Sequence, residues 1–230
     1  MIKKIIIVIL VFGLIYALFN TRLTTRQGVN FVVVTKEIPL YLKALDFFDR
    51  HYNYQELVKE IISGSCGENE RLLRIFEWTH KTIKMQPHEL PIIDDHVWNI
   101  IVRGYGTKDQ ICDVFATLCT YVGLKSFFSE FKNDNSELFV LAFVKIRGQY
   151  RVFDPVNGIY LRNKIGEFAT IENILNGDFV INAIDKKIPE NYNDMIKKFL
   201  KSDKVDYKRS FIQSPLNRFI YEVKKWTNQK

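Results

Sequence analysis

One stretch, residues 104–123, constrains the fold of this chain more than any other. Glycines at 104 and 106 begin it, and they permit the positive φ that a Cβ would oppose. Asp109 then offers a side-chain oxygen that can cap the first amides of a helix. Apolar residues recur at helical spacing at positions 111, 115, 118, 119 and 122, and Gly123 ends the run. The pattern predicts a buried helix from about residue 108, entered through a glycine-rich turn.

After Gly123 the hydrophobic period changes from helical to extended. Residues 138–146 and 150–153 are typical of two strands, and Arg147-Gly148 provides the turn between them. The second strand ends in Asp154-Pro155. Shorter strand patterns cover residues 127–128 and 159–161. We therefore expect the helix to pack on an antiparallel sheet that contains residues 138–162.

The turn Gly104-Tyr105-Gly106, the helix that ends at Gly123 and the run from Phe139 to Pro155 together resemble the transglutaminase-like branch of the papain-type cysteine enzymes. The resemblance extends over residues 75–165. It implies an α+β fold in which N-terminal helices pack on a small antiparallel sheet. In that family a Cys at the helix start, a His on the next strand and an Asp before Pro form the catalytic site.

This chain departs from the family at two of those three positions. Counting along the motifs places the Cys on Lys108 and the His on Phe139, while Asp154 is retained. A Cys–His pair works because imidazole accepts the thiol proton near neutral pH, and neither lysine nor phenylalanine does this. All four histidines, at 51, 80, 88 and 96, precede the helix. The resemblance thus implies a retained fold with lost catalysis.

The remnant of this triad predicts a specific contact. Asp154 would be buried without the imidazole that it once oriented, and a buried carboxylate needs a partner. We expect Lys108 to form an ion pair with it, with Tyr105 adding a hydroxyl. Phe139 would fill the volume of the imidazole.

Two other assignments of chemistry remain open. Cys112 could be the nucleophile of an active thiol enzyme, such as a peptidase or an acyl transferase. Lys108 could act through an amine whose pKa is lowered by burial, or it could be an ordinary solvated lysine. No CxxC motif or Cys/His cluster indicates a metal, and we expect no cofactor.

The sequence pattern predicts that residues 1–22 form a membrane anchor. Lys3 and Lys4 precede fifteen uncharged residues, 5–19, with no small-residue cleavage site behind them. A cleaved signal peptide and a core helix are the alternatives. The two lysines favour a cytoplasmic N-terminus and a domain outside the membrane, whereas Arg22 and Arg26 oppose that orientation.

We divide the remainder into a polar stalk, residues 23–38, a transglutaminase-like domain, 39–185, and a basic helical extension, 186–230. The stalk includes a β-like run at 30–34. In the domain we predict helices over 39–52, 55–62, 67–84, 97–102 and 170–175. The triplet Asp94-Asp95-His96 reads either as an acid/base cluster or as a helix N-cap.

The extension carries the net charge of +7, because it holds 12 Lys and Arg against 5 Asp and Glu. One helix is expected from Glu190 and another from Ser214-Pro215, whose apolar positions are 216, 219, 220, 223 and 226. Its basic face suits an anionic membrane surface or envelope polymer, or it is simply solvated. Without a recognisable nucleic-acid module, we expect no nucleic-acid partner. Taken together, these features favour a binding or scaffolding module at the cell envelope, with a membrane protein as another possible partner.

Overall fold

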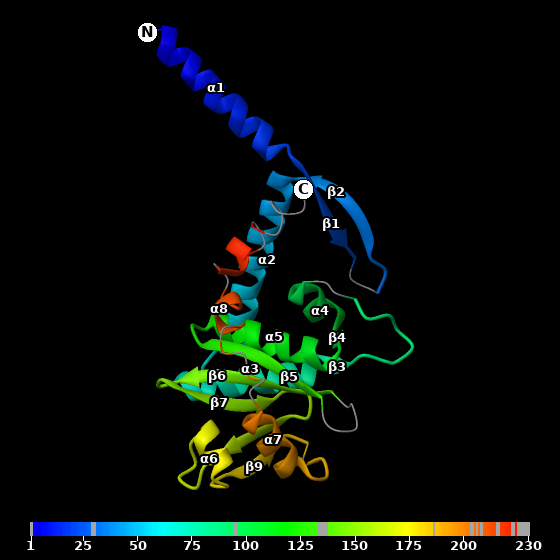
Figure 1. The fold of residues 1–230 in the computed structure, drawn as a ribbon, viewed down its shortest axis with the longest axis vertical. Helices are drawn as coiled ribbons and strands as arrows, with labels where there is room; N and C mark the ends of the chain where they lie inside the picture. The colour runs from blue at the N-terminus through cyan, green and yellow to red at the C-terminus, as the bar shows by residue number, and fades with distance from the viewer. Residues whose placement is uncertain are drawn as a thin grey trace.

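The computed structural model describes residues 2–28, 31–93, 96–132, 138–185, 187–202, 205, 207, 209–214, 217–221 and 224. Helix α1 (Ile2–Phe19) projects from one end of the molecule, and none of its residues is buried (Figure 1). It is the one helix in these ranges that is long and apolar enough to cross a membrane. The anchor pattern of the sequence therefore forms a helix of the expected length.

The expected stalk is a β-hairpin. Strand β1 (Arg22–Gln27) pairs with β2 (Val34–Pro39) in antiparallel register, and Arg22 lies opposite Pro39. The prediction of a strand at residues 30–34 was wrong, because pairing with β1 begins only at Val34; residues 29 and 30 lie outside the described ranges. This hairpin connects α1 to the helical part of the chain.

A long helix, α2 (Leu40–Ile61), replaces the two helices expected over 39–62. No glycine or proline interrupts residues 52–55, so the helix continues through them. Helices α3 (Glu68–Thr82) and α4 (Val97–Arg103) match their predicted positions. His96 is the N-cap of α4 and makes no side-chain capping bond, while Asp94 and Asp95 lie outside the described residues.

Helix α5 (Lys108–Tyr121) lies where the sequence places it and ends before Gly123, whose φ is 84°. It packs on the sheet formed by β5 (Lys125–Lys132), β6 (Leu138–Ile146), β7 (Gln149–Asp154), β8 (Ile159–Arg162) and β9 (Val180–Ala183). These strands are antiparallel and follow one another in sequence order. The expected α+β arrangement is confirmed, and β9 is an additional strand that the sequence patterns did not indicate.

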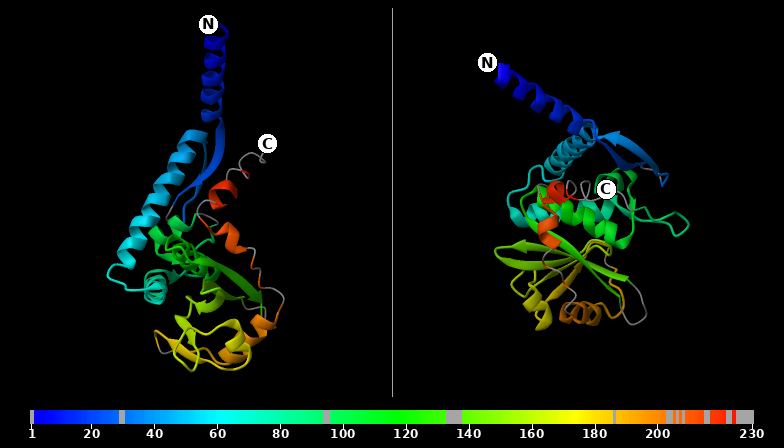
Figure 2. Two further views of the ribbon diagram at one scale, coloured as in Figure 1. Left: turned by 90° about the vertical axis from the view of Figure 1, so that its left-hand side faces the viewer. Right: turned by 45° about the horizontal axis from the view of Figure 1, so that its top comes forward.

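The sheet is covered on both faces (Figures 1 and 2). Helix α5 covers one face, together with α3, α4 and part of α2. Helices α6 (Ile171–Leu175) and α7 (Tyr192–Lys201) contribute to the core on the other face. Along β6, Val140, Ala142 and Val144 point into the first core, and Leu141 and Phe143 point into the second. This alternation decides which side chains meet at the candidate site.

The C-terminal region continues beyond α7. A short helix, α8 (Arg209–Ile212), contacts β5. Residues 217–221 are helical, as expected, and the ring centroid of Phe219 lies 4.6 Å from that of Phe47 on α2. Pro215, Leu216, Val223 and Trp226, which belong to the predicted C-terminal helix, lie outside the described residues, as do residues 133–137.

Candidate functional site

The turn before α5 has the tight geometry that its glycines indicate, but the two glycines serve different purposes. Gly104 has a φ of 73° and ends α4 in the left-handed region. Gly106 has no positive φ; a Cβ there would lie 3.1 Å from both Ile100 Cγ2 and Gln110 Cβ. Gly106 is therefore required by the close approach of two side chains, not by its backbone angles.

The N-cap of α5 is Thr107, not Asp109. Thr107 and Gln110 form a reciprocal capping box, in which the Thr107 amide donates to Gln110 Oε1 over 3.1 Å. Asp109 lies in the first turn and accepts a hydrogen bond from the Thr107 hydroxyl. The expected cap was wrong by two residues, since the helix begins directly after Thr107.

Lys108, to which the sequence resemblance assigned the position of the cysteine, is the first residue of α5. Its ammonium group donates a 2.9 Å hydrogen bond to the carbonyl of Leu138 at the start of β6. None of the ion pairs between described residues joins Lys108 to Asp154, so the predicted Lys108–Asp154 contact was wrong. Tyr105 is 42% exposed and is not a hydrogen-bond partner of Asp154.

Asp154 is 1% exposed and has partners other than those expected. Its Oδ1 accepts from the Asn157 amide over 3.0 Å, and its Oδ2 accepts from the Asn157 side chain over 2.7 Å. The Tyr192 hydroxyl donates to Oδ2 over 3.1 Å. Burial raises the pKa of the Asp154 carboxyl, although the hydrogen bonds from Asn157 and Tyr192 act to lower it. The need for hydrogen-bonding partners is met by Asn157 and Tyr192.

Phe139 points to the opposite face of the sheet from α5. Its ring centroid lies 5.8 Å from that of Tyr192 and 6.1 Å from that of Phe199, both on α7. Its neighbours Leu138 and Val140 pack in the core beneath α5 instead. Successive side chains on a strand point to opposite faces of the sheet. The prediction that Phe139 packs beside Lys108 was therefore wrong, because Leu138 and Val140, one position away, are the residues that face α5.

Cys112 is wholly buried one turn inside α5. Its thiol lies 3.8 Å from the carbonyl oxygen of Val140, to which it donates. Burial raises its pKa well above the ordinary value, and the nearby carboxylates, Asp154 first, raise it further. A buried thiol held in the protonated state is a poor nucleophile. The geometry therefore opposes the alternative in which Cys112 performs covalent catalysis.

Sequence patterns did not identify Tyr192 as a neighbour of Asp154, or His80 as a neighbour of Pro155. His80 Nδ1 lies 2.9 Å from the carbonyl oxygen of Pro155, and its Nε2 lies 3.0 Å from Asp185 Oδ2. His80 is half-buried on α3. Gly158 makes room for the ring, because a Cβ there would lie 2.7 Å from Nε2. The turn at Asn157-Gly158 was the only local signal, and it did not indicate these distant partners.

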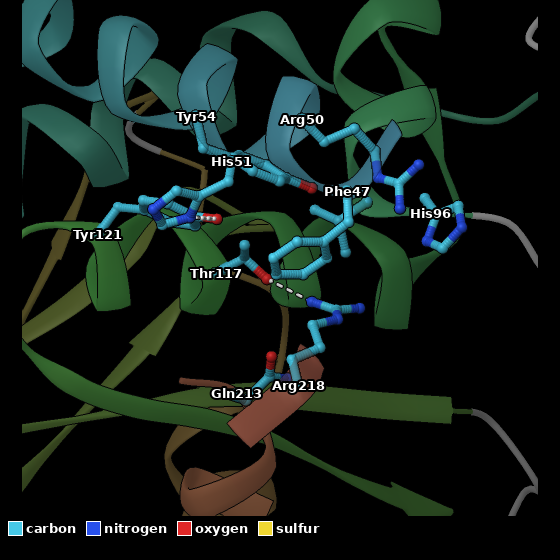
Figure 3. Close-up of a pocket in the computed structure, with 10 residues that line it drawn as sticks. Phe47, Arg50, His51, Tyr54, His96, Thr117, Tyr121, Gln213 and Arg218 are labelled. Atoms are coloured by element: carbon cyan, nitrogen blue, oxygen red, sulfur yellow. Dashed lines mark hydrogen bonds between the residues drawn. The ribbon is translucent and has the colours of Figure 1, made fainter. Parts of the chain in front are cut away.

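A separate small cavity lies between α2, α5 and the C-terminal segment (Figure 3). Its volume is about 30 Å³, which is enough for about two water molecules. His51 Nδ1 lies 3.0 Å from the Tyr121 hydroxyl, and Arg218 donates to the Thr117 hydroxyl over 3.3 Å. The lining residues are Phe47, Arg50, His51, Tyr54, His96, Val97, Thr117, Tyr121, Gln213 and Arg218. The cavity is too small for a polymer segment.

The described part of the chain contains no cluster of metal-ligating side chains. No group of three or more His, Cys, Asp or Glu residues there is arranged to hold a metal ion. Of the predicted site residues, Asp154 and Phe139 both contact Tyr192, whereas Lys108 and Cys112 bond to backbone carbonyls of β6. The four residues therefore do not converge on a common solvent-accessible point.

No protein-family model matches the sequence, and no curated protein matches it. The structure is similar to a putative cysteine protease from Cytophaga hutchinsonii, at 13% identity and a TM-score of 0.40, over 57% of this chain and 41% of that one. It is also similar to a TGase, at 10% identity and a TM-score of 0.39, over 57% of this chain and 43% of that one. A putative protease from Parabacteroides distasonis matches at 11% identity and a TM-score of 0.37, over 59% of this chain and 36% of that one.

These similarities concern the fold. The structure itself is a mixed helix and sheet domain, and likenesses with TM-scores of 0.37–0.40 carry no argument about its family. The chain spans less than half the length of each of the three matched chains. At such low identity the likeness carries no statement about activity, and the chemistry has to be judged from the residues of this chain.

Proposed function

We propose that this protein is a membrane-anchored, transglutaminase-like domain that has lost its catalytic Cys and His and acts as a binding or scaffolding module at the cell envelope. The observation that carries the proposal is the hydrogen bond from Tyr192 to Asp154. The carboxylate that would orient a catalytic imidazole is instead bound by Tyr192, the first residue of α7. A tyrosine with a raised pKa does not replace histidine as a proton acceptor near neutral pH.

The environments of Lys108 and of Cys112, the alternative nucleophile, support the same proposal. Lys108 occupies the helix start, where the family has its nucleophile, and its ammonium group is engaged by the Leu138 carbonyl. The thiol of Cys112 is buried, so it is not available to a substrate. Acyl transfer through cysteine needs an exposed thiolate and a neighbouring base, and both are missing from the described part of this site.

Anchoring is supported by α1, whose apolar side chains are exposed along its whole length. A helix of 18 residues spans about 27 Å, close to the thickness of the hydrocarbon core of a bilayer. With Lys3 and Lys4 on the cytoplasmic side, the domain would lie outside the cytoplasm. An envelope polymer or another membrane protein is then the partner class that the domain would meet.

Activity assays on the full-length protein in detergent micelles test the loss of catalysis. We expect no hydrolysis of generic peptide substrates and no transfer to amine donors, with or without added reductant. Cys112→Ala should give the same background rate. A turnover that is present in the unaltered protein and abolished by Cys112→Ala would overturn the proposal and establish a thiol enzyme.

Binding to a soluble acidic polysaccharide, polygalacturonate, tests the polymer as a partner. The double variant Lys198→Gln/Lys201→Gln removes two exposed charges from α7. We expect it to weaken binding at low salt, because each contact to a polyanion contributes a salt-dependent electrostatic term. Lys59→Gln/Lys125→Gln, which removes two exposed charges elsewhere, is the control. Equal weakening by both pairs would show that only net charge matters and would argue against a site on α7.

A further inference from the structure

Helix α2 presents apolar side chains on two opposite faces. One face packs against the domain, where Tyr54 and Val58 are buried. The other face carries a stripe of four exposed side chains, which are 38%, 59%, 59% and 61% exposed: Tyr41, Leu45, Phe48 and Tyr52. A helix that is apolar on both sides is usually covered on both sides. The ring centroid of Phe48 also lies 6.3 Å from that of Phe219 in the C-terminal segment. In the described part of the chain all four side chains nevertheless stay at least 38% exposed, so the stripe can accept a further partner.

The spacing of the stripe indicates what kind of partner fits it. Its members are separated by four, three and four residues, which is the a/d repeat of a two-stranded coiled coil. At 100° per residue they lie within a band narrow enough to form a seam with one other helix. Gln55, Glu56 and Lys59 follow on the same side, so the stripe ends where α2 reaches the domain.

The position of α2 in the chain defines the orientation of such a pair. The first half of α2 lies between α1 and the domain, and only the β1–β2 hairpin separates the two helices (Figures 1 and 2). Two copies anchored in one membrane through α1 would direct their α2 helices the same way. Each stripe would then meet its own counterpart in parallel and in register.

We propose that the exposed stripe of α2 is a dimer interface, at which two copies of this chain form a short parallel coiled coil next to the membrane. This inference rests on the anchoring part of the proposed function. Eight side chains at the exposures given above would bury at most roughly 900 Å² in total, at about 110 Å² each. That area is below the roughly 1,000 Å² expected of a stable interface between soluble proteins. Confinement of both copies in the membrane raises their effective concentration and compensates for the small area.

Disulfide trapping of the full-length protein in membranes tests the register. Cys66 is exposed, whereas Cys112 and Cys119 are buried, so Cys66→Ser provides a background without reactive thiols. In that background we compare Tyr52→Cys with Asn53→Cys, a neighbouring position about 100° around the helix. A disulfide needs Cα atoms about 4.4–6.8 Å apart, which only a seam position provides across a parallel pair. We expect Tyr52→Cys to form a covalent dimer under mild oxidation at least tenfold faster than Asn53→Cys.

A second substitution tests whether the stripe causes the association. Leu45→Glu, added to the Tyr52→Cys variant, should reduce cross-linking at least tenfold, because two carboxylates would face each other in the seam. Since Leu45 is 59% exposed, this change should leave the melting temperature of the domain nearly unchanged. Lys36→Glu, at an exposed position on β2, is the matched control and should cross-link normally.

Two results would overturn the dimer. One is equal cross-linking at positions 52 and 53, and the other is no cross-linking at 52 in a chain that intact mass shows to be full length. A chain that has lost its N-terminal residues would overturn the anchor, and the dimer that depends on it would fail for that separate reason. Intact mass measurement of the same sample distinguishes these cases.

Discussion

The hydroxyl of Tyr192 donates a 3.1 Å hydrogen bond to Oδ2 of Asp154, across 38 residues of sequence. Tyr192 is the first residue of α7 and is 2% exposed. Its ring also packs edge-to-face against Phe139. One side chain thus contacts both Asp154 and Phe139, two of the residues that the sequence singled out. The contact contributes to the burial of the Asp154 carboxyl, which is 1% exposed.

Removing the Tyr192 hydroxyl should destabilise the fold. Tyr192→Phe leaves Asp154 buried with one fewer donor, and we expect a loss of about 1–3 kcal/mol in the free energy of unfolding. Urea denaturation measures this loss. Tyr160→Phe, at a half-buried tyrosine packed at the other face of the sheet, is the control and should cost less. Equal effects of the two changes would mean that the Tyr192–Asp154 bond is energetically unimportant.

The buried carboxyl of Asp154 should make stability depend on pH. Because its folded pKa is raised above 3.8, the folded state binds the proton more tightly than the unfolded state does. Its contribution to stability is thus greatest below the unfolded pKa and is lost as pH rises through the folded pKa. Asp154→Asn removes this dependence, so the stability of the unaltered protein relative to the variant should fall by up to about 1.4 kcal/mol per pH unit within that window. Parallel pH profiles of the two proteins would contradict the assignment.

Lys108 should contribute to stability through the carbonyl of Leu138. Lys108→Met retains most of the aliphatic chain and removes the donor of the 2.9 Å hydrogen bond. We expect a loss of about 1 kcal/mol in the free energy of unfolding. Lys125→Met, at an exposed lysine on β5, should change stability by less than about 0.5 kcal/mol. If Lys108→Met has no larger effect than the control, the hydrogen bond does not hold the helix start to β6.

Cysteine reactivity should follow burial. Cys66 is exposed and should react rapidly with a disulfide reagent in the folded protein. Burial raises the pKa of both Cys112 and Cys119, so neither should react until the chain unfolds. Mass spectrometry after brief labelling counts the modified thiols, and Cys66→Ser should show none. Modification of Cys112 at a rate close to that of Cys66 would show that the thiol is accessible and would revive the thiol-enzyme alternative.

The apolar N-terminal helix should remain attached to the protein. Bulky residues fill positions 16, 18 and 19, where a signal peptidase requires small ones. The intact mass of protein extracted from membranes measures this directly and should include residues 1–22. A mature chain beginning between residues 18 and 30 would identify α1 as a cleaved signal peptide. Release of the protein by high salt, without detergent, would equally contradict the anchor.

The sequence predicted the elements with strong local signals. Helix α5 begins at Lys108 and the hairpin of β6 and β7 ends at Asp154, both as expected, because glycine turns and hydrophobic periodicity are local properties. Strand β9 and the long α2 were missed. Strand β9 is only four residues long and forms by pairing with β8, so its local sequence signal is weak. Helix α2 was predicted as two helices, although no glycine or proline separates them.

By itself, the sequence determined the helix from Lys108 and the hairpin that ends at Asp154, in an order that resembles the transglutaminase-like motif. Only the tertiary structure decided what surrounds Asp154. The parity of β6 directs Phe139 away from α5, and the path of the chain brings Tyr192 back beneath the sheet. Neither placement follows from the spacing of residues in the sequence. A one-residue change of register reverses the faces of a strand. Contacts between residues that are distant in sequence depend on how the layers pack.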